Sequence, residues 1–179
     1  FYWIGKIKEA FRFWGFNEIY SYSMVSEELL DGPVENAVKL KNPLTNDHAY
    51  LRRTIIPSLL QVSQENKRRD TQNLFEIANV YLKKKSGLPD EKLHLAGLMK
   101  GQEATFMKGK GIVEQLFKTL GITKFGFEKK NDGIEGATIS IKGSAVGSIE
   151  VGEEITFELD IAQLLSHASA KKTYKIHLQ

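Results

Sequence analysis

The predicted β-strands of this chain follow one another without a helix between each neighbouring pair. Strands are expected over residues 17–25, 74–82, 94–99, 138–141, 146–150 and 155–161. Helices are expected from the start of the chain to Gly15, and over residues 57–68, 106–120 and 161–167. Parallel neighbours need a long crossover, usually a helix, whereas antiparallel neighbours need only a turn. The order therefore predicts an α+β domain with a mostly antiparallel sheet flanked by helices.

Length and composition are typical of a globular protein from a reducing compartment. A chain of 179 residues fits one domain, so residues 1–179 are expected to form a single domain. The absence of cysteine excludes disulfides, thiolate zinc sites and thiol nucleophiles. No apolar run reaches the roughly 20 residues that span a bilayer, so no membrane partner is expected and a cytoplasmic location is predicted. Because the sequence begins without Met inside a predicted helix, we expect it to be cut from a longer protein.

The N-terminal helix has a wider apolar surface than one core requires. Its core positions follow the three- and four-residue spacing of a helix, and further apolar residues widen the stripe to an arc of roughly 200°. These residues are Tyr2, Trp3, Ile4, Ile7, Ala10, Phe11, Phe13 and Trp14. Two interpretations fit this width. The helix is either packed on two sides within its own domain, or held between its domain and a second subunit with Tyr2, Trp3, Phe13 and Trp14 as the candidate interface.

Three adjacent cations, Lys67, Arg68 and Arg69, lie where the second predicted helix ends. The helix dipole favours cations at that position by about 0.3–1 kcal/mol each, which is enough to explain them. Adjacent cations can also contact the phosphates of RNA, and Lys83–Lys85 would extend such a surface. The net charge of +3 permits contact with RNA without requiring it.

Glu76 lies in an otherwise apolar predicted strand. An unpaired carboxylate would be costly to bury there. We therefore expect a structural ion pair across the sheet with Arg52, Arg53 or Arg69.

Glu158 and Asp160 alternate with Phe157 and Leu159, which places the two carboxylates on one face of a strand. Paired carboxylates can hold Mg²⁺. Such a pair is more often the solvated face of a sheet, and that is the interpretation we favour.

Two further patterns suggest ligand sites only weakly. Lys108-Gly-Lys-Gly111 at a helix start resembles a phosphate cradle, but it lacks the Ser or Thr of a P-loop, so solvated lysines on a flexible segment before the helix are expected. The four histidines, His48, His94, His167 and His177, are scattered, and none forms a spaced pair suited to a metal.

Taken in order, short segments along nearly the whole chain resemble the β subunit of phenylalanyl-tRNA synthetases. Each segment is unspecific alone, but their order and spacing together are specific. They are Gly15–Ser23, Asn42–Thr45, Leu51-Arg52 with Pro57–Leu60, Asn66 with Arg69, Leu74–Ile77 with Val80-Tyr81, Leu88-Pro89 with Glu91, Lys110–Glu114 with Leu120-Gly121, Val146–Ile149 and Phe157–Ile161.

The resemblance implies that the chain is the catalytic-like domain of such a β subunit, with a class II aminoacyl-tRNA synthetase-like core. The first signature motif of that class is a helix and strand at a subunit interface, and residues 3–25 are similar to it. The resemblance thereby favours the interface interpretation of the N-terminal helix.

The resemblance also implies that the chemistry of the class is missing here. Where the family's catalytic α subunit has Val-Tyr-Arg, this chain has Val80-Tyr81-Leu82, and leucine cannot bind a phosphate or a carboxylate. The glycine-rich third motif and its arginine are also missing from Gly152–Leu159. Because losing one preorganised donor costs about 10²–10³ in rate, no catalytic, cofactor-binding or metal-binding residue is expected.

The predicted function is therefore a non-catalytic scaffold domain of phenylalanine–tRNA ligase. Its expected partner is the α subunit, which charges tRNA with phenylalanine, and the ATP and Mg²⁺ of the whole enzyme are expected to be bound by other parts. Two alternatives remain open. One is an RNA-binding module that uses Lys67, Arg68, Arg69 and Lys83–Lys85, and the other is a free-standing small-molecule binder derived from a synthetase core.

Overall fold

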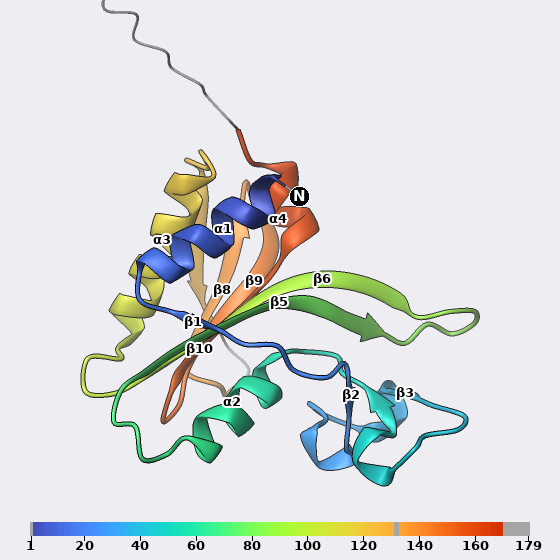
Figure 1. Cartoon of the computed structure of the whole chain (residues 1–179). Coiled ribbons are helices and arrows are strands. Elements are labelled where there is room, and N and C mark those ends of the chain that lie inside the picture. The colour runs from blue at the N-terminus through green and yellow to red at the C-terminus, as the bar shows by residue number, and fades with distance from the viewer. Residues whose placement is uncertain (1, 131–132, 170–179) are drawn as a thin grey trace, which may run out of the picture.

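A seven-stranded sheet forms the framework of the chain, whose computed structural model describes residues 2–130 and 133–169 (Figure 1). Its strands lie in the order β1-β5-β6-β10-β9-β8-β7. Their bounds are β1 Asn17–Glu18, β5 Gln72–Leu82, β6 Asp90–Lys100, β7 Phe125–Lys129, β8 Gly136–Ile141, β9 Ser144–Val151 and β10 Ile155–Asp160. Neighbouring strands are antiparallel except β1 and β5, which are parallel. The predicted fold class is confirmed.

Helices cover both faces of this sheet (Figure 1). On one face lie α1 Tyr2–Phe13, α3 Phe106–Thr119 and α4 Ile161–Ser166, and on the other lies α2 Ile56–Glu65. Each of the four falls within three residues of its predicted bounds. In the described part of the chain, no helix has both the length and the apolar character needed to cross a membrane.

Alternation along the central strands divides the buried side chains between two cores. Phe75, Leu95 and Phe157 face α1, α3 and α4 and belong to the larger core. Ala96 and Leu98 face the opposite side and pack with α2. Because successive side chains of a strand point to opposite faces, strands buried on both sides must be apolar at almost every position, as β5 and β6 are over their central residues.

A second, three-stranded sheet packs beside the first and has its own small core (Figure 1). Its strands lie in the order β2-β4-β3, and short 3₁₀ helices connect them. The bounds are β2 Met24–Val25, η1 Glu27–Leu29, η2 Val34–Asn36, β3 Val38–Lys39, η3 Asn46–His48 and β4 Tyr50–Leu51. Tyr50 is buried in this core, and its hydroxyl donates to Glu27 at 3.0 Å.

The hairpin of β5 and β6 is the longest element of the sheet. Its two strands have 11 residues each, and they pair from Gln72 with Lys100 to Leu82 with Asp90. The hairpin extends beyond the other strands, so that its loop lies near the small sheet (Figure 1). Gly87 in this loop has φ of +83°, a backbone conformation that favours glycine.

The sequence prediction differs from the structure at several strands. It misses the two-residue strands β3 and β4 of the small sheet, and β6 begins at Asp90, four residues before the predicted start. Residues 17–25, predicted as one strand, divide between β1 in the large sheet and β2 in the small one. Between them, the backbone N–H and hydroxyl of Ser21 donate to the Glu76 carboxylate at 3.1 and 2.7 Å, which replaces strand pairing. The sequence does not predict β7, because Gly126 interrupts its short apolar pattern, although pairing with β8 completes the strand.

Gly147 in β9 allows the closest backbone approach within the sheet, and we expect Gly147→Ala to destabilise the chain. A methyl group there would lie 2.0 Å from the carbonyl oxygen of Glu158, so the backbone of β9 or β10 must shift. Overpacking of this kind typically costs about 1–3 kcal/mol, and a backbone clash belongs at the upper end. Urea denaturation would measure the loss.

The matched control is Gly111→Ala in α3, where the added methyl group meets nothing within 4 Å. Alanine in a helix interior is about 0.5–1 kcal/mol more favourable than glycine, so this variant should be slightly more stable. Equal stability of the two variants would contradict the tight packing of β9 on β10.

Candidate functional site

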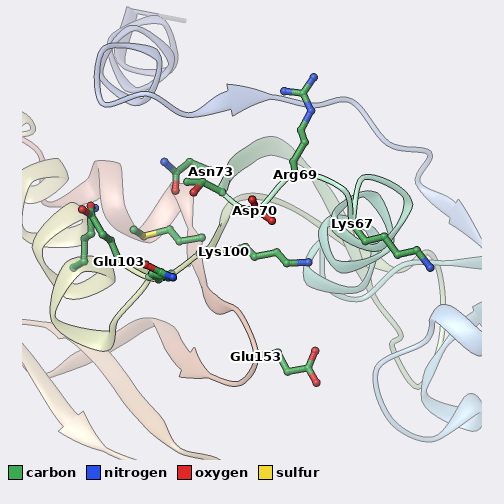
Figure 2. Close-up of a pocket in the computed structure, with 13 residues that line it drawn as sticks. Lys67, Arg69, Asp70, Asn73, Lys100, Glu103 and Glu153 are labelled. Atoms are coloured by element: carbon green, nitrogen blue, oxygen red, sulfur yellow. The ribbon is translucent and has the colours of Figure 1, made fainter.

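A cleft of about 910 Å³ lies where β5 begins and β6 ends. Its walls come from the segment after α2, the two strand ends, the N-terminus of α3 and the turn between β9 and β10. The charged residues that line it are Lys67, Arg69, Asp70, Lys100, Glu103, Lys108 and Glu153 (Figure 2). This cleft is large enough for a small ligand, but four cations are mixed with three carboxylates.

The predicted cationic cluster does not converge in this cleft. Lys67 and Arg69 line it, and their side chains point in different directions (Figure 2). Arg68 is exposed and lies outside the lining. The structure therefore brings two of the three predicted RNA-contact residues to one cleft without directing them at a common point.

The other two cations of the cleft lie next to carboxylates. Lys108 donates to Glu103 at 2.5 Å, and this hydrogen bond and charge lower the pKa of Glu103. Lys100 lies 3.9 Å from Glu154. Both carboxylates reduce the positive potential of the cleft.

Arg52 and Glu76 form a buried ion pair between the small sheet and the large one. Arg52 Nη2 lies 3.2 Å from Glu76 Oε1, and both residues are 2% exposed. Arg52 also donates through Nη1 to Ser21 Oγ at 2.7 Å and through Nε to the carbonyl of Asn79 at 3.0 Å. The predicted structural pairing of Glu76 is confirmed, and Arg52 is its partner.

Glu158 is not on a solvated face, so that expectation was wrong. Its side chain is 12% exposed and lies at the N-terminal end of α2, where it accepts from the hydroxyl of Thr54 and the backbone N–H of Ile55. His94 Nδ1 lies 2.7 Å from its Oε1. Sequence alternation gives the face of a residue but not what covers that face, and here α2 covers it.

Asp160 is also buried, and it ends β10 by capping α4. Its carboxylate accepts from the backbone N–H of Gln163 at 3.1 Å and from Lys92 at 3.3 Å. Burial raises its pKa, but these hydrogen bonds and the charge of Lys92 outweigh burial, so that the pKa lies below its ordinary value. The two carboxylates that could have held Mg²⁺ thus have separate protein partners.

The Lys108–Gly111 segment forms part of α3 and is not a flexible segment before it. Thr105 caps the helix by accepting from the backbone N–H of Lys108 at 3.2 Å. Gly109 is buried, and a methyl group there would lie 2.7 Å from Ile155. This glycine therefore permits close packing of α3 on the sheet, which the sequence pattern alone does not distinguish from a phosphate cradle.

The histidines lie apart from one another in the structure. His48 contacts the carbonyl of Met24 at 3.2 Å, and His94 contacts Glu158. His167 ends α4, and His177 lies outside the described residues. Among the residues that the structure describes, no group of three or more His, Asp or Glu is placed to hold a metal.

The four candidate interface residues divide between the inner and outer sides of α1. Trp3 and Trp14 are half-buried against the larger core. Tyr2 is 64% exposed and Phe13 is 88% exposed. The domain therefore covers α1 on one side only and leaves two aromatic residues on the other.

Glu18 fixes α1 to the strand that follows it. Its carboxylate accepts from Lys8, from Arg12 at 2.6 Å and from the Tyr20 hydroxyl at 2.8 Å. Burial raises the pKa of Glu18, but these three hydrogen bonds together lower it below its ordinary value. Tyr20 and Tyr22, which the sequence places in a strand, are 77% and 73% exposed.

A second basic group lies at the opposite end of the β5–β6 hairpin. A groove of about 510 Å³ is lined by Asn36, Arg53, Leu82, Lys83, Lys84 and Lys85. Lys83–Lys85 were visible as a basic run, but Arg53 was not connected to them, because only the packing of the hairpin loop beside the small sheet brings them together. Leu82, the residue found where the resemblance implies a missing arginine, lies in this groove.

We expect Arg52→Met to destabilise the chain by about 3–5 kcal/mol, because it leaves the Glu76 carboxylate buried without its cation. Arg52→Met with Glu76→Gln should cost less than the sum of the two single changes, since the residues interact directly. Urea denaturation measures each free energy of unfolding. Arg68→Met is the control, because this arginine is exposed and should change stability by less than about 0.5 kcal/mol. A cost for Arg52→Met as small as the control would contradict the buried pair.

Sequence comparison identifies relatives along nearly all of the chain. The family described as phenylalanyl tRNA synthetase beta chain CLM domain matches residues 4–165. The phenylalanine–tRNA ligase beta subunit of Carboxydothermus hydrogenoformans is 31% identical over 146 residues, which cover 71% of this chain and 18% of that protein. The corresponding subunit of Oceanobacillus iheyensis is 30% identical, with 87% of this chain and 24% of that protein covered. The chain spans about a quarter or less of the length of these relatives.

Solved structures of class II synthetases share the fold. A crystal structure of pyrrolysyl-tRNA synthetase from Desulfitobacterium hafniense superposes with a TM-score of 0.78 at 15% identity, and 91% of this chain and 67% of that chain are covered. The PylSc structure from the same organism gives a TM-score of 0.77 with 94% of this chain and 72% of that chain covered. The fold and the sequence match agree, and the chain belongs to the family of phenylalanyl-tRNA synthetase β-chain CLM domains.

Proposed function

We propose that this chain is a non-catalytic domain of a phenylalanine–tRNA ligase β subunit, and that it packs against the α subunit that charges tRNA with phenylalanine. ATP and Mg²⁺ would be bound by the α subunit and not by this domain. The match to the β-chain CLM domain family supports the assignment to a phenylalanine–tRNA ligase β subunit. One structural observation supports the non-catalytic role: Arg52, the one buried arginine among the described residues, is already paired with Glu76 between the small sheet and the large one.

The positions of the arginines carry this argument. Class II chemistry requires arginines that hold a triphosphate and a carboxylate, because the planar guanidinium binds both in a bidentate manner. The arginines of the chain are Arg12, Arg52, Arg53, Arg68 and Arg69. Arg12 on α1 is paired with Glu18 on β1, and Arg52 is paired with Glu76. Neither guanidinium is available to a substrate without breaking an existing ion pair.

The remaining arginines lie away from the centre of the sheet. Arg53 donates to the carbonyl of Asp31 at the small sheet. Arg68 and Arg69 precede β5, whereas Leu82 ends it. At about 3.3 Å per residue, the two ends of that strand are roughly 30 Å apart, so Arg68 and Arg69 cannot replace a cation at Leu82. Arg53 lines the same groove as Leu82, but its guanidinium is hydrogen-bonded to the Asp31 carbonyl. The positions of the arginines therefore support the proposal that the sheet retains the class II framework but has no arginine placed to hold a triphosphate.

The outer side of α1 is the surface that we propose for the α subunit. Tyr2 and Phe13 are 11 positions apart, which places them within about 20° of each other around the helix axis at 100° per residue. Lys6 and Glu9 lie between them as an exposed pair at 3.2 Å. Exposed aromatic residues with a polar surround are typical of the central contacts in protein interfaces.

The alternative function was an RNA-binding module that uses Lys67, Arg68, Arg69 and Lys83–Lys85, and its first three residues have less support. These cations do not converge, and the cleft that two of them line also contains Asp70, Glu103 and Glu153. Carboxylates repel RNA phosphates, so this surface lacks the single sign of charge that typical RNA-binding surfaces have.

We expect Phe13→Asp to weaken binding of the chain to the α subunit by about 10- to 100-fold, since an aromatic anchor in an interface contributes about 2 kcal/mol or more and 1.4 kcal/mol is tenfold. Co-purification and calorimetric titration with the α subunit measure this effect. The matched control is Leu44→Asp, which introduces the same charge at a residue that is 98% exposed in the loop between β3 and η3. If both variants bind like the unchanged chain, α1 is not the interface, and if the unchanged chain does not bind the α subunit, the proposed function is wrong.

A further inference from the structure

We propose that the groove at the tip of the β5–β6 hairpin binds phosphate groups of an RNA backbone. Hereafter we call it the hairpin groove, and its lining is Asn36, Arg53, Leu82, Lys83, Lys84 and Lys85. It is separate from the cleft of Lys67 and Arg69 at the other end of the hairpin. The cations that line the groove support binding of phosphate groups in general. That RNA is the molecule that carries these phosphates rests on the proposed function.

Neutral acceptors orient two cations of the hairpin groove. Arg53 Nη1 donates to the carbonyl of Asp31 at 2.9 Å, and Lys83 Nζ donates to the carbonyl of Glu35 at 2.8 Å. A backbone carbonyl accepts a hydrogen bond without carrying a formal charge. Both side chains are therefore held in place by uncharged acceptor groups, and neither cation has a carboxylate oxygen within 4.0 Å among the described residues.

The net charge of the groove is positive. Lys84 forms an ion pair with Asp90. Within the described part of the chain, no ion pair joins Arg53, Lys83 or Lys85 to a carboxylate. No carboxylate is among the six described residues that line the groove. Three of its four cations thus remain available to an anion, unlike those of the cleft at the opposite end of the hairpin.

The composition of the lining favours a phosphate backbone over other anionic ligands. Leu82 is the one apolar side chain among the described lining residues, and none is aromatic. A bound nucleotide base is usually stacked on an aromatic ring, and a protein partner usually buries aromatic or large apolar anchors. Phosphates of RNA require only oriented cations, which are what this groove provides.

The place of the groove in the fold fits an extended ligand. The hairpin loop extends beyond the neighbouring strands and lies near the small sheet (Figure 1). Arg53 follows β4 of the small sheet, whereas Lys83–Lys85 follow β5 of the large one. An RNA strand that binds here would contact both sheets at once, so binding and the relative placement of the two sheets are linked.

The test is tRNA binding by the full chain and by two variants that each lose two positive charges. Lys83→Gln with Lys85→Gln removes charge from the groove but keeps a donor for the Glu35 carbonyl. Lys67→Gln with Arg69→Gln removes the same charge from the other end of the hairpin. Affinity for a tRNA transcript is measured by fluorescence anisotropy at several salt concentrations, and thermal unfolding verifies that each variant is folded.

We expect the groove variant to bind tRNA about tenfold more weakly, with a salt dependence of log K that is less steep by about 1.4–1.8, because each lost phosphate contact removes about 0.7–0.9 from the slope. The control variant should bind within about twofold of the unchanged chain. Equal losses in both variants would mean that net charge alone drives binding, and no loss in the groove variant would exclude the groove. Either result overturns the proposal.

Two further titrations distinguish the source of the anion. ATP should not compete with tRNA at matched ionic strength, and competition that the groove variant abolishes would assign the groove to a free nucleotide instead. The groove variant should retain its affinity for the α subunit, and loss of that affinity would assign the groove to a protein partner. A chain that binds the α subunit normally but shows no groove-dependent tRNA binding overturns this inference and leaves the proposed function intact.

Discussion

The buried ion pair of Arg52 and Glu76 joins the two sheets of this domain. It places a guanidinium and a carboxylate, both 2% exposed, where the chain passes from the small sheet to α2. Because burial of an unpaired charge is strongly unfavourable, each group requires the other, and Ser21 and Asn79 complete their hydrogen bonds. The small sheet cannot separate from the large one without exposing this pair. The same contact keeps Arg52 buried and paired within the protein.

The two faces of the large sheet differ in what covers them. Three helices and the larger core cover one face, and α1 retains Tyr2 and Phe13 on its exposed side. On the other face, α2 covers Ala96 and Leu98, while Glu158 is bound by Thr54 and His94. A framework of the class II type is thus preserved. Glu158 on this second face also lines a pocket of about 410 Å³ together with Thr54, Ile56, Pro57 and Leu60.

The sequence predicts the framework of this domain better than its sites. Helices and most strands follow from apolar periodicity, and the cost of burying Glu76 correctly predicts a partner among three arginines. Periodicity does not say which element covers a face, so Glu158 was expected in solvent although α2 covers it. Local patterns also cannot connect Arg53 with Lys83–Lys85, because 30 residues separate them and only the fold brings them together. The β7 strand is missed because its stability depends on pairing with β8.

Pyrophosphate exchange with ATP and phenylalanine tests the central claim most directly. The assay is run with this chain alone, with the α subunit alone and with both together. Our account predicts no exchange above background for the chain alone, because Arg52 is bound to Glu76 and Leu82 cannot hold a phosphate. It predicts exchange for the combined subunits. Exchange by the chain alone that increases with ATP concentration would show that this sheet retains catalytic chemistry, and would contradict the account.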